Sequence, residues 1–456
     1  MAGVESMKAI INSFIVKEGH CPYSLGAQSI ARYSNQRGHD VELISTKPQN
    51  LESGINIILS SNASVCGLSS NYVTEPFVIE MAKRIKEKKG REMALVIGGP
   101  SVTYSSRESK IRQSMADLFV RGDGEEAFYH ILEAGVSSVL EGKVKINGVS
   151  SKQYEDINLA SVDLNRLPSP FPIEFKTDHV YWETVRGCAF GCIFCAHPGQ
   201  INKFREFPLK KVSQESDYLR IKEFKAIYIT DPILGGSKNR SKEVLKMLRK
   251  LKGSFITAEY RPEYLDEEVM DLLEDAQIGW LEFGLQTTNQ NLDYFRRNAS
   301  SIKEKLVKLS KRKIKYSLDL IVGIPGDTRE GFKNSLKFAI EEARPTSLKI
   351  FPLRVYDGTV LHQMALNKSW GFDKQTRIIS SSDTFAETEL LEWMTLGVTS
   401  AQLYKFLSEN KWFGREDKFR NLEFFIRFAE RFGKDMSSEY DSRKMNELWQ
   451  RNISNI

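Results

Sequence analysis

Three of the five cysteines in this chain, Cys188, Cys192 and Cys195, have the spacing C-x3-C-x2-C. Thiolates are ligands that iron–sulfur clusters and zinc prefer. Three thiolates on one loop can bind three irons of a cubane cluster and leave the fourth iron open to a substrate or cofactor. A structural zinc site would need a fourth ligand, for which His197 is a candidate, and chance clustering of thiols is the other alternative. The spacing favours an iron–sulfur site with one open iron.

The aromatic residue Phe194 immediately precedes the third cysteine. With it, the loop resembles the cluster motif of the radical S-adenosylmethionine (SAM) superfamily. The resemblance implies a [4Fe-4S] cluster held by Cys188, Cys192 and Cys195, with SAM on the open iron and Phe194 in the SAM site. It also implies that the reduced cluster cleaves SAM to a 5'-deoxyadenosyl radical, which abstracts hydrogen from unactivated carbon. The sequence has no G-x-S-x-G, H-E-x-x-H or Walker loop, so hydrolase and phosphotransferase functions lack support.

Length and composition describe a multidomain protein without membrane spans. A chain of 456 residues with 41% hydrophobic and 27% charged residues is expected to form two or three domains. No apolar run approaches the roughly 20 residues that span a bilayer, and the N-terminus lacks the layout of a signal peptide. Five cysteines, three of them clustered, do not suggest a disulfide framework. The dispersed net charge of +6 argues against nucleic acid as the main partner, so we expect a cytoplasmic protein with no nucleic-acid or membrane partner.

The first 144 residues alternate short apolar runs with helical stretches, which predicts a doubly wound parallel α/β sheet. We expect strands at 9–14, 40–44, 65–69, 93–97 and 118–120, and helices at 24–37 and 76–88. Several strands end in glycines, and ligands of open α/β sheets bind beyond the carboxyl ends of the strands. These glycine-rich ends predict a binding crevice where the backbone can approach a large flat ligand.

Three short motifs in this region resemble the cobalamin-binding domain that precedes the catalytic barrel in one branch of radical SAM enzymes. They are Cys66-Gly67-Leu68-Ser69, Gly98-Gly99-Pro100 and Gly122-Asp123-Gly124-Glu125. The resemblance implies a Rossmann-like cobalamin-binding domain over 1–144, with cobalamin contacted by Ser69, Asn71, Tyr72, Gly98, Gly99, Gly122, Gly124 and Glu125. The loop 69–74 would face the lower side of the corrin. The cobalt-ligating motif D-x-H-x-x-G is absent; its nearest match contains His20, for which a surface-loop histidine is the favoured interpretation.

The rest of the chain divides into three predicted segments. Residues 145–172 are polar and rich in turn residues, which predicts a linker. Over 173–372 the α/β alternation resumes with longer helices, as a partial (β/α)6 radical SAM barrel would require. Residues 373–456 lose the strand pattern and predict a helical C-terminal domain. Its stripe Phe424, Phe425, Phe428 and Phe432 has helical spacing and is typical of packing rather than of a cofactor site.

The predicted barrel strands end in polar or glycine-rich residues, as a site at the barrel mouth demands. By position, Asp231 could accept hydrogen bonds from the SAM ammonium, although the usual Gly-Gly-Glu is not present. Glu259 and Arg261 are candidates for the SAM ribose and carboxylate, with a surface ion pair as an equally favoured alternative. The segment with Gln286, followed by Arg297, resembles the branch's G-x-Q-S/T element. Residues 319–328 match D-x-I-x-G-x-P-G-D-T, which implies that the backbone at Gly323 and Pro325 approaches the adenine.

The resemblance, which covers roughly residues 8–370, implies a cobalamin-dependent radical SAM methyltransferase. SAM would donate a methyl group, by way of methylcobalamin, to an unactivated carbon or phosphorus of a small metabolite or peptide, with flavodoxin or ferredoxin as electron donor. A non-methylating rearrangement, cyclisation or dehydration, with or without cobalamin, is one alternative. A second alternative is an iron–sulfur redox sensor, although a sensor has no need of a SAM site. Only Cys21 and Cys66 remain for any auxiliary cluster, which is therefore disfavoured.

Overall fold

The computed structural model describes residues 6–15, 24–105, 109–151, 158–171, 177–195, 204–289, 299–414, 417–435 and 440–452. His20, Cys21, His197 and Arg297, which were considered above, lie outside these ranges. Contacts divide the chain into two units, Met1–Ala189 with His197–Thr230 and Phe190–Ala196 with Asp231–Ile456. The four predicted segments, 1–144, 145–172, 173–372 and 373–456, stay a prediction.

The first unit contains the predicted parallel sheet, with strand order β2-β1-β3-β4-β5-β6. All neighbours are parallel except β5 and β6. The strands are β1 (Lys8–Phe14), β2 (Asp40–Thr46), β3 (Val65–Ser69), β4 (Ala94–Gly98), β5 (Leu118–Val120) and β6 (Val149–Ser150). The order reverses between β1 and β3, and such a switch point opens a crevice at the carboxyl ends of the strands.

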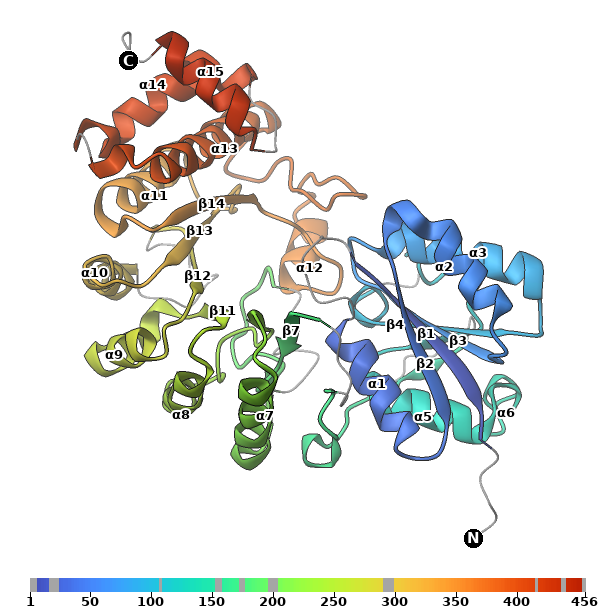
Figure 1. Ribbon diagram of the computed structural model, residues 1–456. Helices are drawn as coiled ribbons and strands as arrows, with labels where there is room; N and C mark the ends of the chain where they lie inside the picture. The colour runs from blue at the N-terminus through green and yellow to red at the C-terminus, as the bar shows by residue number, and fades with distance from the viewer. Residues whose placement is uncertain are drawn as a thin grey trace. The chain divides into compact units, whose positions relative to one another are not determined.

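Helices cover both faces of this sheet (Figure 1). α1 (Leu25–Asn35) and α5 (Gly124–Ala134) pack on one face, where Ile11, Val96 and Phe128 share a core. α2 (Leu51–Ser60) and α3 (Glu75–Lys89) cover the other face over Ile10 and Leu95. The short helices α4 (Pro100–Thr103) and α6 (Val136–Leu140) complete the unit's N-terminal part. The doubly wound α/β prediction is confirmed, whereas α2 was not among the expected helices because its apolar run and Gly54 give little helical signal.

Part of the segment predicted as a linker belongs to the first sheet. Strand β6 pairs antiparallel with β5, and Ala160 forms an isolated bridge with Gly122. The predicted linker 145–172 therefore contains residues that pair with β5 and with Gly122, and its bounds stay a prediction. A two-residue strand is too short to show the alternation from which strands are predicted.

The first unit also holds the parallel strands β7 (His179–Trp182) and β10 (Ala226–Ile229) with α7 (Leu209–Lys222) between them in the chain. A two-stranded antiparallel ribbon follows β7 and consists of β8 (Val185–Arg186) and β9 (Arg205–Glu206). This ribbon lies immediately before and after the segment that carries the cysteines.

The second unit continues the strand and helix alternation. Its parallel strands, in the order β14-β13-β12-β11, are β11 (Phe255–Tyr260), β12 (Trp280–Gln286), β13 (Tyr316–Val322) and β14 (Ser347–Pro352). Helices α8 (Lys238–Leu248), α9 (Glu267–Asp275), α10 (Ala299–Leu309) and α11 (Arg329–Lys337) alternate with them along the chain (Figure 1). Alternate strand residues, such as Ala258, Leu281 and Leu318, are buried against the helices. The remaining positions form the inner face, where a barrel carries its polar residues.

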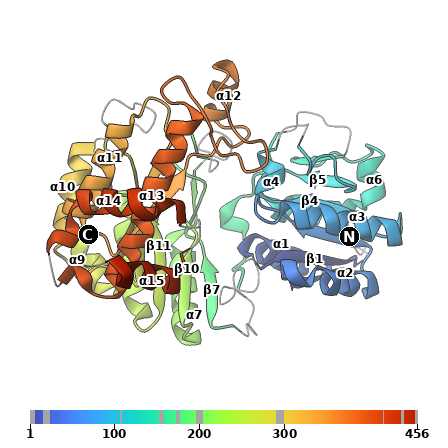
Figure 2. The ribbon, with the colours of Figure 1, turned by 90° about the horizontal axis from the view of Figure 1, so that it is seen from above.

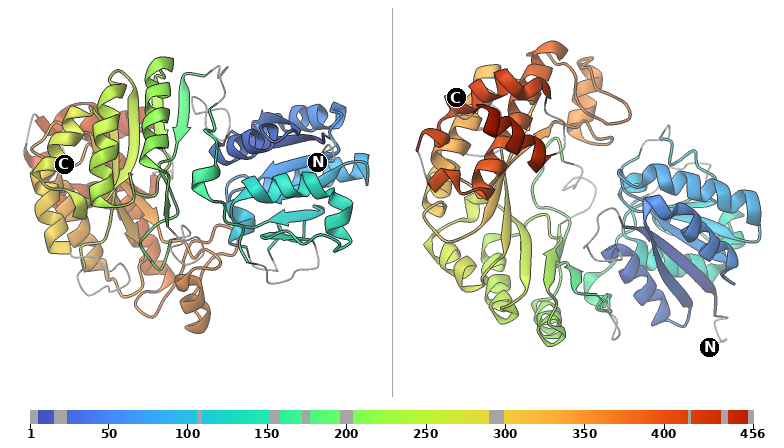
Figure 3. Two further views of the ribbon diagram at one scale, coloured as in Figure 1. Left: turned by 90° about the horizontal axis from the view of Figure 1, so that it is seen from below. Right: turned by 45° about the horizontal axis from the view of Figure 1, so that its top comes forward.

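The C-terminal part of the second unit is helical, as predicted. It contains α12 (Val360–Asn367), α13 (Glu387–Glu409), α14 (Leu422–Phe432) and α15 (Ser442–Asn452). α13 packs on β14 and on α14, and the last three helices lie together (Figure 2; Figure 3). The stripe Phe424, Phe425, Phe428 and Phe432 is buried, which confirms its packing role. Within the described residues, none of the helices is long and apolar enough to cross a bilayer.

Candidate functional site

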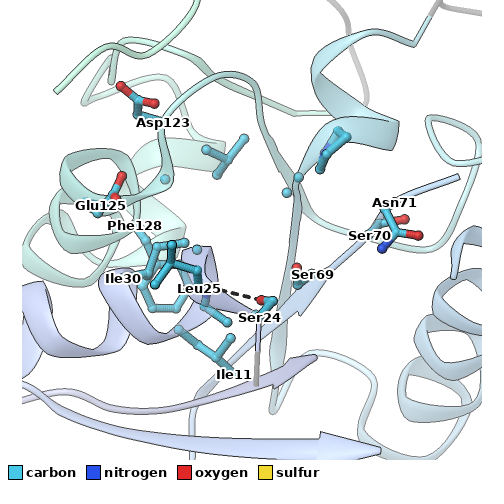
Figure 4. A pocket seen from close by; sticks show the side chains of 18 of the residues that line it. Ile11, Ser24, Leu25, Ile30, Ser69, Ser70, Asn71, Asp123, Glu125 and Phe128 are labelled. Carbon is cyan, nitrogen blue, oxygen red and sulfur yellow. Dashed lines mark hydrogen bonds between the residues drawn. The ribbon is translucent and has the colours of Figure 1, made fainter. Parts of the chain in front are cut away.

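A cavity of about 410 Å³ lies in the first unit beyond the carboxyl ends of β1, β3, β4 and β5 (Figure 4). Apolar side chains form much of its wall, including Ile11, Leu68 and Phe128. The turn between β5 and α5 contributes Asp123 and Glu125, which Figure 4 shows on the rim. A concave, largely apolar site with few polar groups is typical of small-molecule and cofactor binding. The crevice predicted from the glycine-rich strand ends is therefore present.

The structure brings seven of the eight predicted cobalamin residues to this cavity. Those that line it are Ser69, Asn71, Gly98, Gly99, Gly122, Gly124 and Glu125. Tyr72 does not line it, and its side chain is exposed. The reason is the turn that begins α3: the Asn71 side-chain oxygen accepts hydrogen bonds from the amides of Val73 (2.9 Å) and Thr74 (3.0 Å). This turn directs the intervening Tyr72 outward.

Two of the glycines that line the cavity are also required by the local backbone conformation. Gly99 has φ +102°, and a Cβ there would lie 2.4 Å from the Ser70 carbonyl oxygen. Gly122 has φ +91°, and a Cβ there would lie 2.3 Å from the carbonyl oxygen of Ala160. Residues with a side chain rarely adopt such φ values, and neighbouring backbone atoms leave no room for a Cβ at either position. These glycines are required for the fold of the rim, in addition to any approach of a ligand.

Several lining residues escaped the sequence analysis. Glu183 and Arg186 follow β7, yet they line the cavity together with Asp123 and Glu125. Ser24 and Leu25 at the start of α1 and Thr230 after β10 line it too. The sequence does contain a hint of this contact. Arg186 lies just before the cysteine loop, and the Gly-Asp-Gly-Glu turn carries carboxylates with which an arginine can pair. The spacing of these residues in the sequence does not show that they contact one another, because the contact depends on the tertiary structure.

The cysteine loop crosses from one unit to the other: Cys188 belongs to the first, and Cys192 and Cys195 to the second. None of the three cysteines is in a disulfide, and all three are partly exposed. Among the described residues, these thiols included, no three His, Cys, Asp or Glu side chains surround a point as ligands of one ion would. A cubane differs from a single ion because each thiolate binds a different iron. Partly exposed cysteines outside disulfides, in this spacing, are the donor set that such a cluster needs, whereas zinc needs four ligands around one ion.

Three elements of the second unit hold the loop that carries Cys192 and Cys195. The guanidinium of Arg261 lies 3.6 Å from the ring centroid of Phe190. Phe194 packs against Ile324 in the turn after β13. The amide of Leu361, in the first turn of α12, donates a hydrogen bond of 3.0 Å to the Ile193 carbonyl. The ends of β11 and β13 and the start of α12 therefore position the loop.

The predicted SAM residues at the first strand ends have partners in the structure. Asp231 is buried, and its carboxylate accepts a hydrogen bond of 2.9 Å from the amide of Gly235. Arg261 forms an ion pair with Glu263 at this strand end, and none of the described ion pairs joins it to Glu259. The role of Asp231, Glu259 and Arg261 in SAM binding stays a prediction.

A charged layer lies on the inner face of strands β11 to β14. Glu259 is in register with Glu282, and Asp319 with Lys349. The Nζ of Lys349 lies 2.8 Å from a Glu282 carboxylate oxygen. Glu259 opens onto the inner face yet is surrounded by protein, and this desolvation, with repulsion from Glu282 and Asp319, raises its pKa to about 7. Desolvation, with repulsion from Glu282, raises the pKa of Asp319 to about 6. The layer therefore holds more carboxylate than Lys349 neutralises.

We expect Glu259→Gln to stabilise the protein at about pH 8 and to leave its stability unchanged near pH 4. The folded state raises the pKa of Glu259 from 4.5 to about 7, so ionisation disfavours folding increasingly as the pH rises between these values. The glutamine removes this cost, and the melting temperature at the two pH values measures it. Glu430→Gln, at an exposed position of α14, is the control. Equal shifts for the two variants at pH 8 would contradict the assignment.

Gln286 has an unusual backbone for a residue other than glycine. Its φ is +64°, and the pairing of β12 with β13 shifts register between Gly284 and Gln286. A Cβ at Gly284 would lie 2.0 Å from the Gln286 side-chain nitrogen, so the glycine leaves room for that amide. Strained conformations of this kind cluster at ligand sites. The geometry supports the prediction that Gln286 contacts SAM or substrate.

The motif at 319–328 forms the end of β13 and the turn into α11. Asp327 is buried and accepts hydrogen bonds from the amide of Thr328 (2.8 Å) and the hydroxyl of Thr287 (3.3 Å). It thereby ties the turn to the end of β12. A Cβ on Gly323 would lie 2.9 Å from the Leu390 side chain, so this glycine also permits packing of the C-terminal region. The approach of Gly323 and Pro325 to the adenine stays a prediction.

Comparison with known proteins gives two family matches. The model of the radical SAM superfamily matches residues 182–339, and the model of the B12 binding domain matches residues 13–132. The uncharacterized methyltransferase PH0819 of Pyrococcus horikoshii is 25% identical over 73% of this chain and 77% of its own length. The putative methylthiotransferase MJ0865 of Methanocaldococcus jannaschii is 23% identical over 70% of this chain and 72% of its own.

A solved structure shares the fold over most of the chain. It is that of the radical SAM methyltransferase TsrM from Kitasatospora setae with cobalamin and a [4Fe-4S] cluster bound. It aligns with a TM-score of 0.66 and 14% identity over 94% of this chain and 100% of that one. The cavity lies in the part that matches the B12 binding domain and the cysteine loop in the part that matches the radical SAM domain. The chain is therefore an enzyme that contains a B12 binding domain over residues 13–132 and a radical SAM domain over residues 182–339, and its cofactors are a [4Fe-4S] cluster, SAM and cobalamin.

Proposed function

We propose that this protein is a cobalamin-dependent radical SAM methyltransferase that methylates an unactivated carbon or phosphorus of a small metabolite or peptide. The observation that carries the proposal is the cavity at the ends of β1, β3, β4 and β5, lined by residues of all three cobalamin-type motifs. It occurs in one chain with the three cysteines of the loop, none of which is in a disulfide. A methyltransferase needs both sites, because the cluster supplies radical chemistry from SAM and cobalamin supplies a methyl carrier when bound.

The roles of the protein's own residues follow from their chemistry. Cys188, Cys192 and Cys195 would hold the cluster as thiolates. Gln286 and Asp231 would bind polar groups of SAM, while Glu259 and Arg261 would contact its ribose and carboxylate. The apolar wall around Ile11, Leu68 and Phe128 would exclude water from the bound corrin. Exclusion of water matters because it protects reactive intermediates from side reactions.

Methylthio transfer is a weaker candidate, although several relatives are named methylthiotransferases. Adding a methylthio group requires a sulfur source besides the methyl donor. A second iron–sulfur cluster would need further thiolates, and the sequence outside the loop has only Cys21 and Cys66. Cys66 lies in β3 with no exposed surface, and burial raises the pKa of its thiol to about 12. A protonated, inaccessible thiol does not bind iron.

The first test is the iron and cobalt content of protein purified without oxygen from cells supplied with cobalamin. We expect about four irons per chain, from one cubane, and about one cobalt. Incubation with methyl-labelled SAM and a chemical reductant, followed by candidate substrate pools, then reports whether label reaches a product. Iron without cobalt would exclude cobalamin-dependent methyl transfer. Both metals with SAM cleavage but no labelled product would favour a rearrangement, cyclisation or dehydration instead.

A further inference from the structure

Five charged side chains form a buried network on the wall of the cavity in the first unit. They are Asp123, Glu125, Glu183, Arg186 and Arg205, and we name them the pocket-wall network. Their side chains are between 3% and 19% exposed. All but Arg205 line the cavity itself. Buried charges are costly unless they are paired and hydrogen-bonded, so such a group persists only where its geometry is well satisfied.

Arg186 is the centre of the network because it contacts all three carboxylates. Its Nη1 donates to Asp123 (3.2 Å) and to Glu125 (3.2 Å). Its Nη2 donates to the other oxygen of Glu125 (3.0 Å) and to Glu183, and its Nε also donates to Glu183 (3.4 Å). The guanidinium thus binds Glu125 and Glu183 in two-point fashion. Lysine cannot reproduce this planar fork.

The outer members of the network anchor it to the rest of the unit. Arg205 in β9 donates to Asp123 (2.6 Å) and to the Val162 carbonyl (2.8 Å). The hydroxyl of Ser29 in α1 donates to Glu125 (2.7 Å). Ion pairs therefore join the turn on the cavity rim to the ribbon of β8 and β9, and the hydrogen bond from Ser29 joins α1 to the same network.

The pocket-wall network lies close in sequence to the cysteine loop, because one of its members, Arg186, lies just before that loop. Arg186 ends β8, and Gly187 with φ +79° separates it from Cys188. Cys188 belongs to the same unit as the cavity. A side chain fixed to the cavity wall thus lies two residues before the first cysteine of the loop.

We infer that Arg186 is a positioning residue that couples occupancy of the cavity by cobalamin to the placement of Cys188 in the cluster loop. This inference rests on the proposed function, because it takes cobalamin as the occupant and the cysteines as cluster ligands. It goes further in assigning to one arginine the link between the two cofactors. The fork to Glu125 and Glu183 makes the link specific to arginine.

The test compares the wild type with Arg186→Lys and Glu125→Gln. Each protein carries its reconstituted cluster, is reduced with dithionite, and is examined by electron paramagnetic resonance with and without hydroxocobalamin. Glu125→Gln keeps the shape of the side chain and removes one charge, so it serves if Arg186→Lys does not fold. Arg312→Met is the matched control, since Arg312 also contacts three carboxylates, Glu267, Asp271 and Glu274, but at the surface of the second unit.

In the wild type and in Arg312→Met, we expect cobalamin to change the cluster signal. In Arg186→Lys and Glu125→Gln, we expect cobalamin to bind about tenfold more weakly, through loss of one charge-assisted pair. At saturating cobalamin, their cluster signal should no longer respond. A persistent response in both variants, or no response in the wild type despite bound cobalamin, would overturn the inference. Failure of the wild type to bind cobalamin at all would instead overturn the proposed function.

Discussion

Replacing any one of Cys188, Cys192 and Cys195 by alanine is expected to reduce the iron content from about four per chain to well below one, and SAM cleavage to background. Each thiolate binds its own iron, so no remaining ligand compensates for a lost one. Iron analysis, the visible spectrum and the release of methionine from SAM measure the effect.

Cys66→Ala is the matched control for this series. Cys66 has the same side chain as the loop cysteines, but it is buried in β3. Burial raises the pKa of its thiol to about 12. It is therefore protonated at neutral pH and does not ligate iron. We expect Cys66→Ala to keep its full iron content with a modest loss of stability. Retention of the cluster in two of the three loop variants would show that these residues are not the ligands.

Replacing Gly98 by leucine is expected to weaken cobalamin binding by about 100-fold or more, which corresponds to about 2.7 kcal/mol. Gly98 ends β4 and lines the cavity. A Cβ at this position would meet Val120 at 3.5 Å, an ordinary contact, and the backbone of Gly98 is not left-handed. The larger side chain therefore fits the local fold but takes space from the ligand. Titration with hydroxocobalamin, followed by its visible spectrum, measures the affinity.

Gly98→Ala is the graded control, because a single methyl group adds only the ordinary contact with Val120. We expect its affinity to stay within a few-fold of the wild type, and both variants to keep their iron. Gly99 would be a poor choice for this experiment, since its positive φ and its proximity to Ser70 would disturb the fold itself. Undiminished cobalamin binding by Gly98→Leu would place the corrin elsewhere.

Local sequence patterns predicted the features that depend on neighbours in the chain. The strands of the first sheet follow from apolar runs, and the cavity follows from glycines at their carboxyl ends. The C-x3-C-x2-C spacing by itself predicts three thiolate ligands for a cluster, because the three cysteines lie on one loop. The buried stripe from Phe424 to Phe432 likewise follows from helical periodicity.

The tertiary structure decided which distant residues meet. Arg186 and Glu125 are 61 positions apart, and their ion pair exists because packing within the first unit brings the end of β8 to the first turn of α5. The inner charged layer depends on strand register, which places Glu259 beside Glu282 and Asp319 beside Lys349. Tyr72 does not line the cavity because the Asn71 side chain accepts hydrogen bonds from the amides of Val73 and Thr74 in the turn before α3, a choice among local hydrogen bonds that composition leaves open. Composition and spacing thus determined the chemistry of each site, whereas packing and register determined which charges and side chains surround it.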